Sequence, residues 1–508
     1  CDGIDGEVGN GLFVAKNGHD DNTGTRELPL LTISAAISKA QTDSVRDVYV
    51  ATGVYSASVT LKAGVQVYGG YSSDFETRDT ILYETVIMGT EASPSTPGAV
   101  TGTNISGSNA AVLDGFTIYG HDNKNPGASS YAVYLSNCGD AVTISNCHVI
   151  AGDGAKGVTG QDGIDGGDGN GGNSGNNALE TNSEFCPTGQ TIVAGGSAGG
   201  NSCGGTDLSG GRGGHGICPN PGTAPAASEL GSTGKGSNPG SGGDAGWDAA
   251  FTNFNNPCGT CSVDPDKISE GQPGGNGANG VHGTPGSGCT AGLGNVQGGL
   301  WVPGTGNSGL NAGHGSGGGG GGAGQGSYVQ WAFFADGECY DEVGGAGGGG
   351  GSGACGGTGG TAGSGGGASF GIFLYFDGSV TTQPVLLGNL VEAGVGGDGG
   401  DGGAGGTGGV GGEGGLGGTG GTGDAWCTSG GGQGGKGGNG GHGGGGGGGC
   451  GGDAYGVYVH GASGASLQSY KDDNWFVFGQ AGQPGSGGPS IGNPGADGAS
   501  GTIANTNF

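Results

Sequence analysis

Cysteine offers the most chemistry in this sequence of 508 residues, which contains 13 of them. Cys258 and Cys261 enclose two residues, which is the spacing of redox and zinc motifs. A zinc site needs a second pair of ligands and a redox motif needs a strand-to-helix context, and neither surrounds this pair. We therefore expect Cys258 and Cys261 to serve a structural disulfide.

The other cysteines predict an oxidising compartment, where disulfides persist. Cys1 stands first, which resembles the lipidated cysteine of bacterial lipoproteins, so we expect a lipid anchor or an intermolecular link there. An intermolecular disulfide and a free thiol are the plainer alternatives. The other twelve are candidates for six intrachain disulfides: Cys138, Cys147, Cys186, Cys203, Cys218, Cys258, Cys261, Cys289, Cys339, Cys355, Cys427 and Cys450.

Carboxylates at triplet spacing are the second group with possible chemistry. They are Asp162, Asp165, Asp168, Asp398 and Asp401, and their oxygens could ligate Ca²⁺. Their spacing does not fit the tandem nonapeptide calcium repeat. We expect solvated acidic edges with at most weak Ca²⁺ binding, and no other cofactor. The eight histidines are scattered without the spacing of metal ligands.

A strict triplet pattern positions many of these residues. From Val395 to Thr422 a non-glycine residue stands at every third position. This period fits neither an α-helix nor a β-strand, but it fits the extended threefold helix of polyproline II geometry. The run contains no proline, so we predict a polyglycine II arm, not collagen. A second arm follows Trp426 and Cys427, and a flexible glycine linker would have no reason to keep the period.

Two extended arms joined by a turn also constrain the cysteines. Cys427 would lie at the tip of this hairpin and Cys450 near its base, too far apart to pair with each other. We predict that each pairs with a cysteine of the glycine-rich stretch 152–368.

Composition excludes several classes of protein. The chain has 145 glycines, a hydrophobic fraction of 31% and a charged fraction of 11%, which is too little apolar material for a conventional core of this length. Its net charge of −30 repels nucleic acid and anionic membranes, so we expect neither as a partner. Only the possible lipid at Cys1 would connect the protein to a membrane.

The N-terminal part carries a different signature. Leu12-Phe13-Val14-Ala15 precedes a helical pattern from Ala35 to Ala40, and short β-branched runs follow at 48–55 and 65–71. Over about residues 10–150 the sequence resembles right-handed parallel β-helix proteins of the pectin-lyase-like superfamily, particularly bacterial cell-surface members. The resemblance implies a helix that caps stacked strands.

An internal repeat links the distant parts of the chain. The strand-like segment 130–135 recurs at 369–374 and 454–459, and each copy is followed by a second short strand, at 146–149, 389–391 and 474–477. We predict that the copies belong to one core and that glycine-rich excursions separate them.

The expected fold class is therefore all-β, a right-handed parallel β-helix solenoid with long polyglycine II excursions stapled by disulfides. Its parts are a cap with strands, a cysteine-containing glycine-rich excursion, a strand unit, a polyglycine II hairpin, and a C-terminal strand unit with a tail. Their ranges are 1–151, 152–368, 369–394, 395–453 and 454–508.

Enzyme activity needs a constellation that the strand segments do not offer. Asp114, Asp140 and His148 are the candidates there, without the paired carboxylates or basic residue of polysaccharide-active enzymes. We expect a non-enzymatic, extracellular protein of the bacterial cell surface that self-assembles into a filament or matrix. An adhesin for surface glycans is the alternative. Ice binding through Thr407, Thr419 and Thr422 is a third hypothesis.

Overall fold

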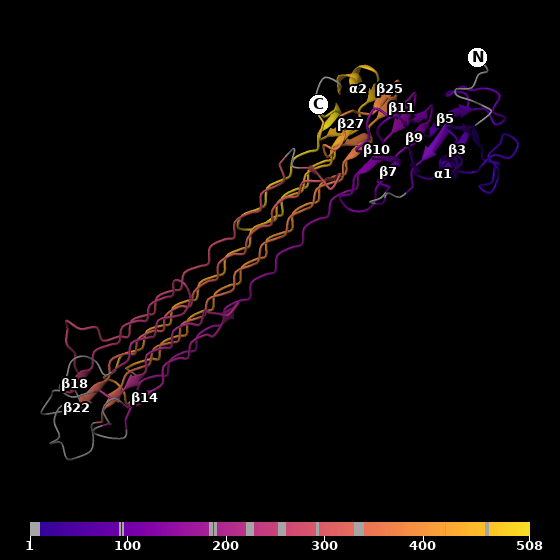
Figure 1. Cartoon of the computed structure of the whole chain (residues 1–508). Helices are drawn as coiled ribbons and strands as arrows, with labels where there is room; N and C mark the ends of the chain where they lie inside the picture. The colour runs from indigo at the N-terminus through magenta and orange to yellow at the C-terminus, as the bar shows by residue number, and fades with distance from the viewer. Residues whose placement is uncertain are drawn as a thin grey trace.

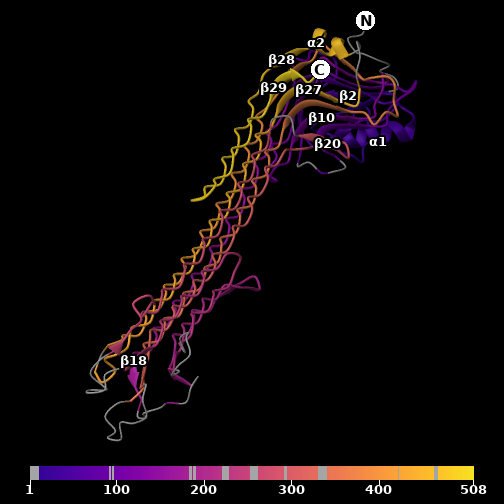
Figure 2. The ribbon, with the colours of Figure 1, turned by 90° about the vertical axis from the view of Figure 1, so that its left-hand side faces the viewer.

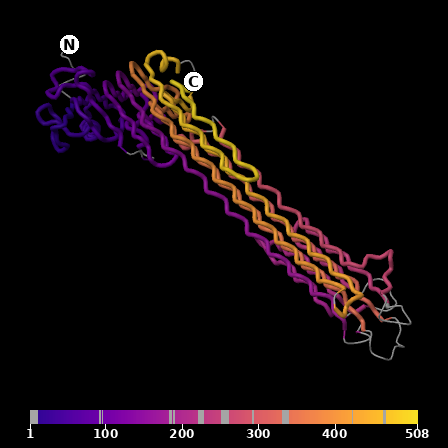
Figure 3. Tube along the Cα trace, turned by 180° about the vertical axis from the view of Figure 1, so that it is seen from behind, coloured from indigo at the N-terminus to yellow at the C-terminus, as the bar shows by residue number. Residues whose placement is uncertain are grey.

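The protein, described here as a computed structural model, consists of a head and a long rod that projects from it (Figure 1). The structure describes residues 11–508 except 91–92, 94–95, 182–185, 187–189, 220–227, 252–260, 291–293, 330–339, 422 and 463–466. Both ends of the described chain lie in the head, as Figure 3 also shows. The rod is built from the glycine-rich segments.

Three six-stranded sheets form the head. The first contains β1 (Leu12–Val14), β2 (Asp47–Ala51), β5 (Gln66–Tyr71), β8 (Ala111–Asp114), β11 (Val142–Ser145) and β25 (Val385–Leu387). The second contains β4 (Val59–Thr60), β7 (Gly98–Thr103), β10 (Ser130–Ser136), β24 (Ser369–Tyr375), β27 (Ala454–His460) and β29 (Ile503–Thr506). The third contains β3 (Gly53–Ser56), β6 (Thr85–Met88), β9 (Thr117–Tyr119), β12 (His148–Ile150), β26 (Leu390–Glu392) and β28 (Trp475–Val477).

The core of the head lies between these sheets. Ile144 of the first sheet, Val133 of the second and Val149 of the third are fully buried and belong to one apolar cluster. Alternation along each strand produces this arrangement, since side chains at successive positions point to opposite faces. Thus Val149 is buried whereas His148 and Ile150 on either side are half-buried.

The expected fold class, a single all-β solenoid, is contradicted by this arrangement. The strands form three separate six-stranded sheets, all with parallel pairing, and in the described part of the chain two helices accompany them. Parallel strands need crossover connections, and extended sheets of this kind are typical of folds that also use helices. The combination points to an α/β-type fold and away from a single β-helix solenoid.

Helix α1 (Ile33–Asp43) covers one end of the head. It begins at Thr32, whose hydroxyl accepts a hydrogen bond from Ala35 N at 3.1 Å, and it ends at Ser44 in the left-handed conformation. Its buried side is spaced as one helix face and consists of Ile33, Ala36, Ile37 and Ala40. The short helix α2 (Gln468–Asp472) packs beside β25 at the other end.

The internal repeat is confirmed by strand pairing. In the second sheet Ser130 is in register with Ser369, and Ser369 with Ala454, although these pairs are 239 and 85 positions apart in the chain. In the third sheet the companion strands β12, β26 and β28 are likewise adjacent. The first long excursion therefore leaves the head after β12 of the third sheet and returns at β24 of the second, and the next leaves after β26 and returns at β27.

Extended glycine arms run side by side along the rod (Figures 1 and 2). In the arm 344–367, Gly347, Gly348 and Gly349 donate their N–H groups to three different neighbours at 2.9 Å, and their carbonyls accept from three more at 2.8 Å. The acceptors are Gly214, Gly432 and Asn173, and the donors are Gly196, Gly321 and Gly415. Three residues per turn, each bonded in a different direction, is the geometry that the triplet pattern predicts.

Glycine is required because no space remains for a side chain. A Cβ atom added at Gly347 would lie 1.9 Å from Gly321 O, and one added at Gly348 would lie 2.0 Å from Gly415 O. The buried arms thus replace a side-chain core with backbone hydrogen bonds. We call this hydrogen-bonded set of arms, between residues 152 and 367, 395 and 453, and 480 and 502, the glycine bundle.

Small sheets lie along the glycine bundle, most of them away from the head. A five-stranded sheet at the far end contains β13 (Leu179–Glu180), β18 (Ala249–Phe251), β19 (Cys261–Ser262), β22 (Ser327–Val329) and β23 (Glu342–Val343). Two-stranded ribbons pair β14 (Thr191–Val193) with β17 (Gly216–Ile217), and β15 (Ser202–Cys203) with β16 (Thr206–Asp207). A third ribbon, β20 (Asn295–Gln297) with β21 (Leu300–Val302), packs on the head.

Candidate functional site

Disulfides join the glycine segments to one another. Within the described residues, four are formed: Cys186–Cys218, Cys203–Cys355, Cys261–Cys427 and Cys289–Cys450. Cys427 and Cys450 each pair with a cysteine of 152–368, which confirms that prediction. These bonds indicate an oxidising, extracellular environment. Across the described residues, no helix is both long and apolar enough to cross a membrane.

The remaining cysteine predictions have different outcomes. Cys138 and Cys147 are buried free thiols in the head, so they are not disulfide partners. Burial raises the pKa of the Cys147 thiol to about 12, which keeps it protonated and inert. Cys261 serves a structural disulfide, and its partner is Cys427. Cys1, Cys258 and Cys339 lie outside the described residues.

The triplet carboxylates hold neighbouring arms together. Asp162, Asp165 and Asp168 each accept a hydrogen bond at 2.7 Å from the backbone N–H of the residue 242 positions later. Asp398 and Asp401 accept in the same way from Gln483 and Ser486, at 2.9 and 2.8 Å. These non-glycine positions face outward, and the side chain supplies the acceptor that a further arm would otherwise supply. Within the described residues, no cluster of potential metal ligands is found.

Side-chain acceptors also appear where a short arm ends. Along the arm 395–420, Gly402 and Gly405 donate to the carbonyls of Ser486 and Pro489, after which the C-terminal hairpin turns back (Figure 3). The next groups on that side, Gly408 and Gly411, donate instead to His442 Nδ1 at 3.0 Å and Asn439 Oδ1 at 2.9 Å.

In the arm 344–367, side-chain acceptors likewise replace backbone carbonyls where a neighbouring arm is missing. Gly353 donates to the carbonyl of Leu208, where the neighbouring arm begins. Beyond it Gly356, Gly359 and Ala362 donate to side chains of the arm 304–326. The acceptors are His314 Nδ1 at 3.0 Å, Asn311 Oδ1 at 2.9 Å and Ser308 Oγ at 3.2 Å. Exposed bundle edges are thus satisfied by histidine, asparagine and serine.

Asp114 occupies a hydrogen-bonded network in the head. Its carboxylate accepts from the Ser145 hydroxyl at 2.6 Å and the Asn146 amide at 2.7 Å, and it pairs with the Arg78 guanidinium. Both charged side chains are largely buried. Both oxygens of the Asp114 carboxylate thus contact neighbouring side chains of the fold, which is the environment of a structural group.

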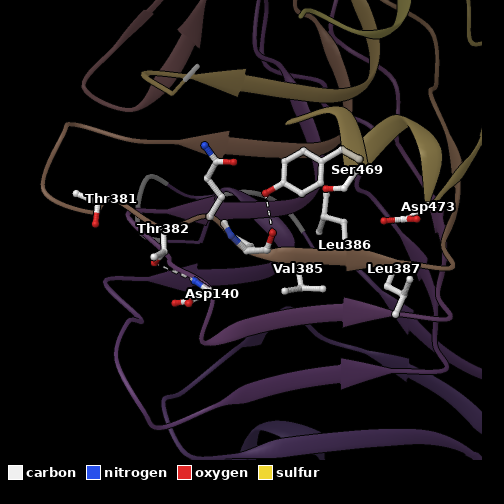
Figure 4. Close-up of a pocket in the computed structure, with 11 residues that line it drawn as sticks. Asp140, Thr381, Thr382, Val385, Leu386, Leu387, Ser469 and Asp473 are labelled. Atoms are coloured by element: carbon white, nitrogen blue, oxygen red, sulfur yellow. Dashed lines mark hydrogen bonds between the residues drawn. The ribbon is translucent and has the colours of Figure 1, made fainter. Parts of the chain in front are cut away.

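Asp140 lies apart from Asp114 and His148, in a separate pocket of about 390 Å³ (Figure 4). The Thr382 hydroxyl accepts a hydrogen bond from Asp140 N at 3.2 Å, and the Tyr470 hydroxyl donates to the Pro384 carbonyl at 2.7 Å. Asp473 and Ser469 also line this pocket. The candidates Asp114, Asp140 and His148 are therefore not brought together as a catalytic set.

His148 lines a larger pocket of about 560 Å³ on the outer face of the third sheet. His148 Nε2 lies 2.7 Å from Glu392 Oε1, and Glu84 Oε1 accepts from the Thr117 hydroxyl at 2.8 Å. Trp475 borders the pocket and is 66% exposed. An exposed aromatic ring beside carboxylates and an imidazole is a polar and apolar combination suited to a sugar.

Sequence reasoning found His148 but missed its companions. Register explains the grouping, because His148 pairs with Leu390 and Leu390 with Trp475 across three strands. The sequence repeats did not contain this signal, because aligning them on Asn146 and Asn474 sets Cys147 opposite Trp475, and only the strand register brings His148 into line with Trp475. Glu84 belongs to no repeat copy, and its contribution depends on tertiary packing that the sequence pattern does not encode.

Two buried carboxylates mark the far end of the rod. Asp341 accepts from the N–H groups of Val329 and Cys186 at 3.0 Å, and Glu342 accepts from Cys427 N at 2.7 Å. Burial is the main cause that raises the pKa of Glu342 to about 7, against the hydrogen bond from Cys427. Glu342 therefore adjoins the Cys261–Cys427 disulfide.

An aromatic ladder joins the head to the rod. On the second sheet Tyr131 stacks on Phe370 with centroids 5.3 Å apart, and Tyr134 on Phe373 at 5.7 Å. Trp301 of the ribbon β20–β21 covers this ladder, and its backbone N–H donates to the Tyr131 hydroxyl at 2.9 Å. The contact fixes one arm of the bundle against the strands from which other arms emerge.

Comparisons of the chain with protein families, with curated proteins and with solved structures gave no match.

Proposed function

We propose that the protein is a non-enzymatic structural protein of the bacterial cell surface, a subunit of an extracellular filament or matrix. The observation that carries this proposal is the continuous backbone hydrogen bonding of residues 345–355 of the arm 344–367 to neighbours on all sides. Such a rod resists bending, because the arms cannot slide without breaking bonds along their whole length. A stiff spacer of this kind suits a scaffold.

Composition and cross-links support the same role. A net charge of −30 keeps the rods soluble and apart at low salt, so assembly would depend on specific surfaces of the head or the ends. Disulfides cross-link segments far apart in sequence, such as Cys289 and Cys450 with a separation of 161 residues. A secreted scaffold benefits from such links, which restrict unfolding where an apolar core is thin.

Electron microscopy of the purified protein, untreated and after reduction, tests the proposal. Ordered filaments or sheets would support it, and their loss on reduction would assign assembly to a disulfide, including any formed by Cys1. Discrete monomers under all conditions would contradict it. The variant C289S/C450S separates the effects of an internal disulfide from those of an intermolecular one.

A second candidate function is binding of surface glycans, which the His148 pocket favours. Its lining combines the exposed Trp475 ring with Glu84 and with His148, which contacts Glu392. Sugars are bound by aromatic stacking together with hydrogen bonds to hydroxyl groups. Glycan-array binding by the monomer tests this function. W475A should abolish binding, whereas L310A, which removes an exposed apolar side chain of the rod, should leave it unchanged. Equal binding by both variants would exclude the pocket.

The ice-binding hypothesis has less support. Thr407 and Thr419 lie on the same edge of the arm 395–420, but Val410, Glu413 and Leu416 stand between them. Thr422 lies outside the described residues.

A further inference from the structure

Two histidines of the glycine bundle act as hydrogen-bond acceptors for backbone N–H groups. His442 Nδ1 accepts from Gly408 N, and His282 Nδ1 accepts from His442 N, both at 3.0 Å. The two rings stack with centroids 5.1 Å apart and planes at 15°. An imidazole can accept at Nδ1 only when that nitrogen carries no proton.

Asparagine performs the same task at the neighbouring triplets. Asn279 Oδ1 accepts from Asn439 N at 2.8 Å, one triplet before the His282 contact, and Asn439 Oδ1 accepts from Gly411 N at 2.9 Å. Equivalent triplet positions thus carry two kinds of acceptor, the asparagine amide and the imidazole. Of these, only the imidazole loses its ability to accept when it takes up a proton. Histidine changes its charge between about pH 5 and 8.

We propose that the stacked pair His282–His442 is an acid-sensitive latch on the edge of the glycine bundle. Proton uptake at both rings converts each Nδ1 from an acceptor into a donor. It leaves the N–H groups of Gly408 and His442 without their acceptors and places two positive rings against each other. The arms 268–289, 395–420 and 429–453 then keep backbone bonds such as Gly443 N to Gly406 O and Gly283 N to His442 O, but they lose the two contacts that the imidazoles supply. The device is independent of the proposed role as a scaffold.

The charge that opposes a proton on one ring is a proton on the other, because the two rings are stacked. Within the described residues, the ionisable groups recorded against each ring are the other ring itself. The arms on which they act carry one ion pair, Lys436 with Glu413 at 2.6 Å, two triplets farther along. His282 is exposed and His442 half-buried, so water and protons reach both rings.

Two further histidines follow the same design. His314 Nδ1 accepts from Gly356 N at 3.0 Å, and no ionisable side chain is recorded against it in the described part of the chain. His215 Nδ1 accepts from Gly195 N at 2.7 Å. Burial and then the nearby Arg212 lower the pKa of His215, against the effect of Glu229, so this ring keeps its acceptor to lower pH than an ordinary histidine.

Hydrogen exchange of the native protein at pH 7.5 and pH 5.5 tests the latch. The amide of Gly408 should lose protection by roughly fivefold on acidification, after correction for the intrinsic pH dependence of exchange. Gly402 and Gly405 provide an internal control, because backbone carbonyls accept from them. Equal changes in protection at Gly405 and Gly408 would overturn the proposal.

Substitutions of the two histidines separate the effect of protonation from the effect of losing the hydrogen bond. H282N/H442N should keep the protection of Gly408 at pH 7.5 and lose its pH dependence, because asparagine already serves at Asn279 and Asn439. H442L should show the acid behaviour at both pH values, whereas H460N, in the head, should behave like the wild type. If H282N/H442N fails to fold, nitrogen-15 spectra of the wild-type imidazoles decide. A proton on Nδ1 of His442 at pH 7.5 would refute the latch.

Discussion

At the scale of single residues, the outward triplet positions share one task. Asp165 and Asn177 accept backbone N–H groups at 2.7 and 3.0 Å, in both cases from a residue 242 positions later. Charge is therefore incidental to the contact. The hydrogen bond from Thr407 lowers the pKa of Asp165, so the carboxylate stays ionised and adds to the net negative charge. Calcium coordination is not needed to explain these carboxylates.

Glu342 gives the clearest prediction at this scale. Its pKa of about 7, raised from 4.5 by burial, means that the folded state favours the neutral acid. The stability that it contributes is complete below about pH 4.5 and is lost as the pH rises through about 7. E342Q should therefore stabilise the protein at pH 8, by on the order of 3 kcal/mol. Thermal unfolding of the wild type and of E342Q at pH 8 measures this effect.

The control for this prediction is the same variant at pH 5, where its advantage should shrink to less than about 1 kcal/mol. Glutamine keeps an oxygen that can accept from Cys427 N, so the substitution isolates ionisation from hydrogen bonding. A constant difference between pH 5 and pH 8 would show that Glu342 ionises without penalty.

At the scale of elements, the period of three predicted the order of the glycine arms, because only a fixed neighbour explains a strict period. The pairing of 130–136 with 369–375 was also accessible from the repeat. The fold class was not, because short β-branched runs indicate strands but not how many sheets they form. Cys138 looked like any other cysteine in the sequence, and only its burial in the head separates it from the disulfide partners.

Two glycine substitutions test the packing of the arms. G347A places a methyl group 1.9 Å from Gly321 O and should destabilise the bundle severely, by more than about 4 kcal/mol if it folds at all. G200A meets nothing within 4 Å and should change stability by less than about 1 kcal/mol. Chemical denaturation compares the two. Similar stability of both variants would contradict the hydrogen-bonded arrangement of the arm 344–367.

Removal of the Cys289–Cys450 disulfide tests the staples. This bond joins the arms 268–289 and 429–453 near the head, and it closes a loop of 161 residues. C289S/C450S should lower the free energy of unfolding by about 2–5 kcal/mol while the arms remain paired. Denaturation of the variant under non-reducing conditions measures the loss. C138S, which removes a free thiol, is the matched control.

At the scale of the whole molecule, the head and rod differ in what stabilises them. Apolar side chains fill the space between the sheets of the head, whereas backbone hydrogen bonds fill the rod. Because hydrogen bonds and apolar burial respond differently to temperature, the two parts need not unfold together.

The dimensions of the rod follow from the same geometry. The arm 344–367 should span roughly 70–80 Å at about 3.1 Å per residue. Negative-stain electron microscopy should show a globular end with a straight rod of this length. Small-angle X-ray scattering of the reduced protein should then report whether the rod stays straight without its disulfides. A compact particle before reduction would contradict the structure.

The constant separation of 242 residues between Asp153 and Val395, Asp162 and Ala404, and Asn177 and Thr419 has a consequence for inheritance. A single codon gained in one arm would rotate everything beyond it by a third of a turn and drive side chains into its neighbours. Only codons in multiples of three, gained or lost at the same level in every adjoining arm, preserve the match. The length of the rod can therefore change only in steps of whole triplets. The fold tolerates point substitutions at outward positions far more easily than insertions.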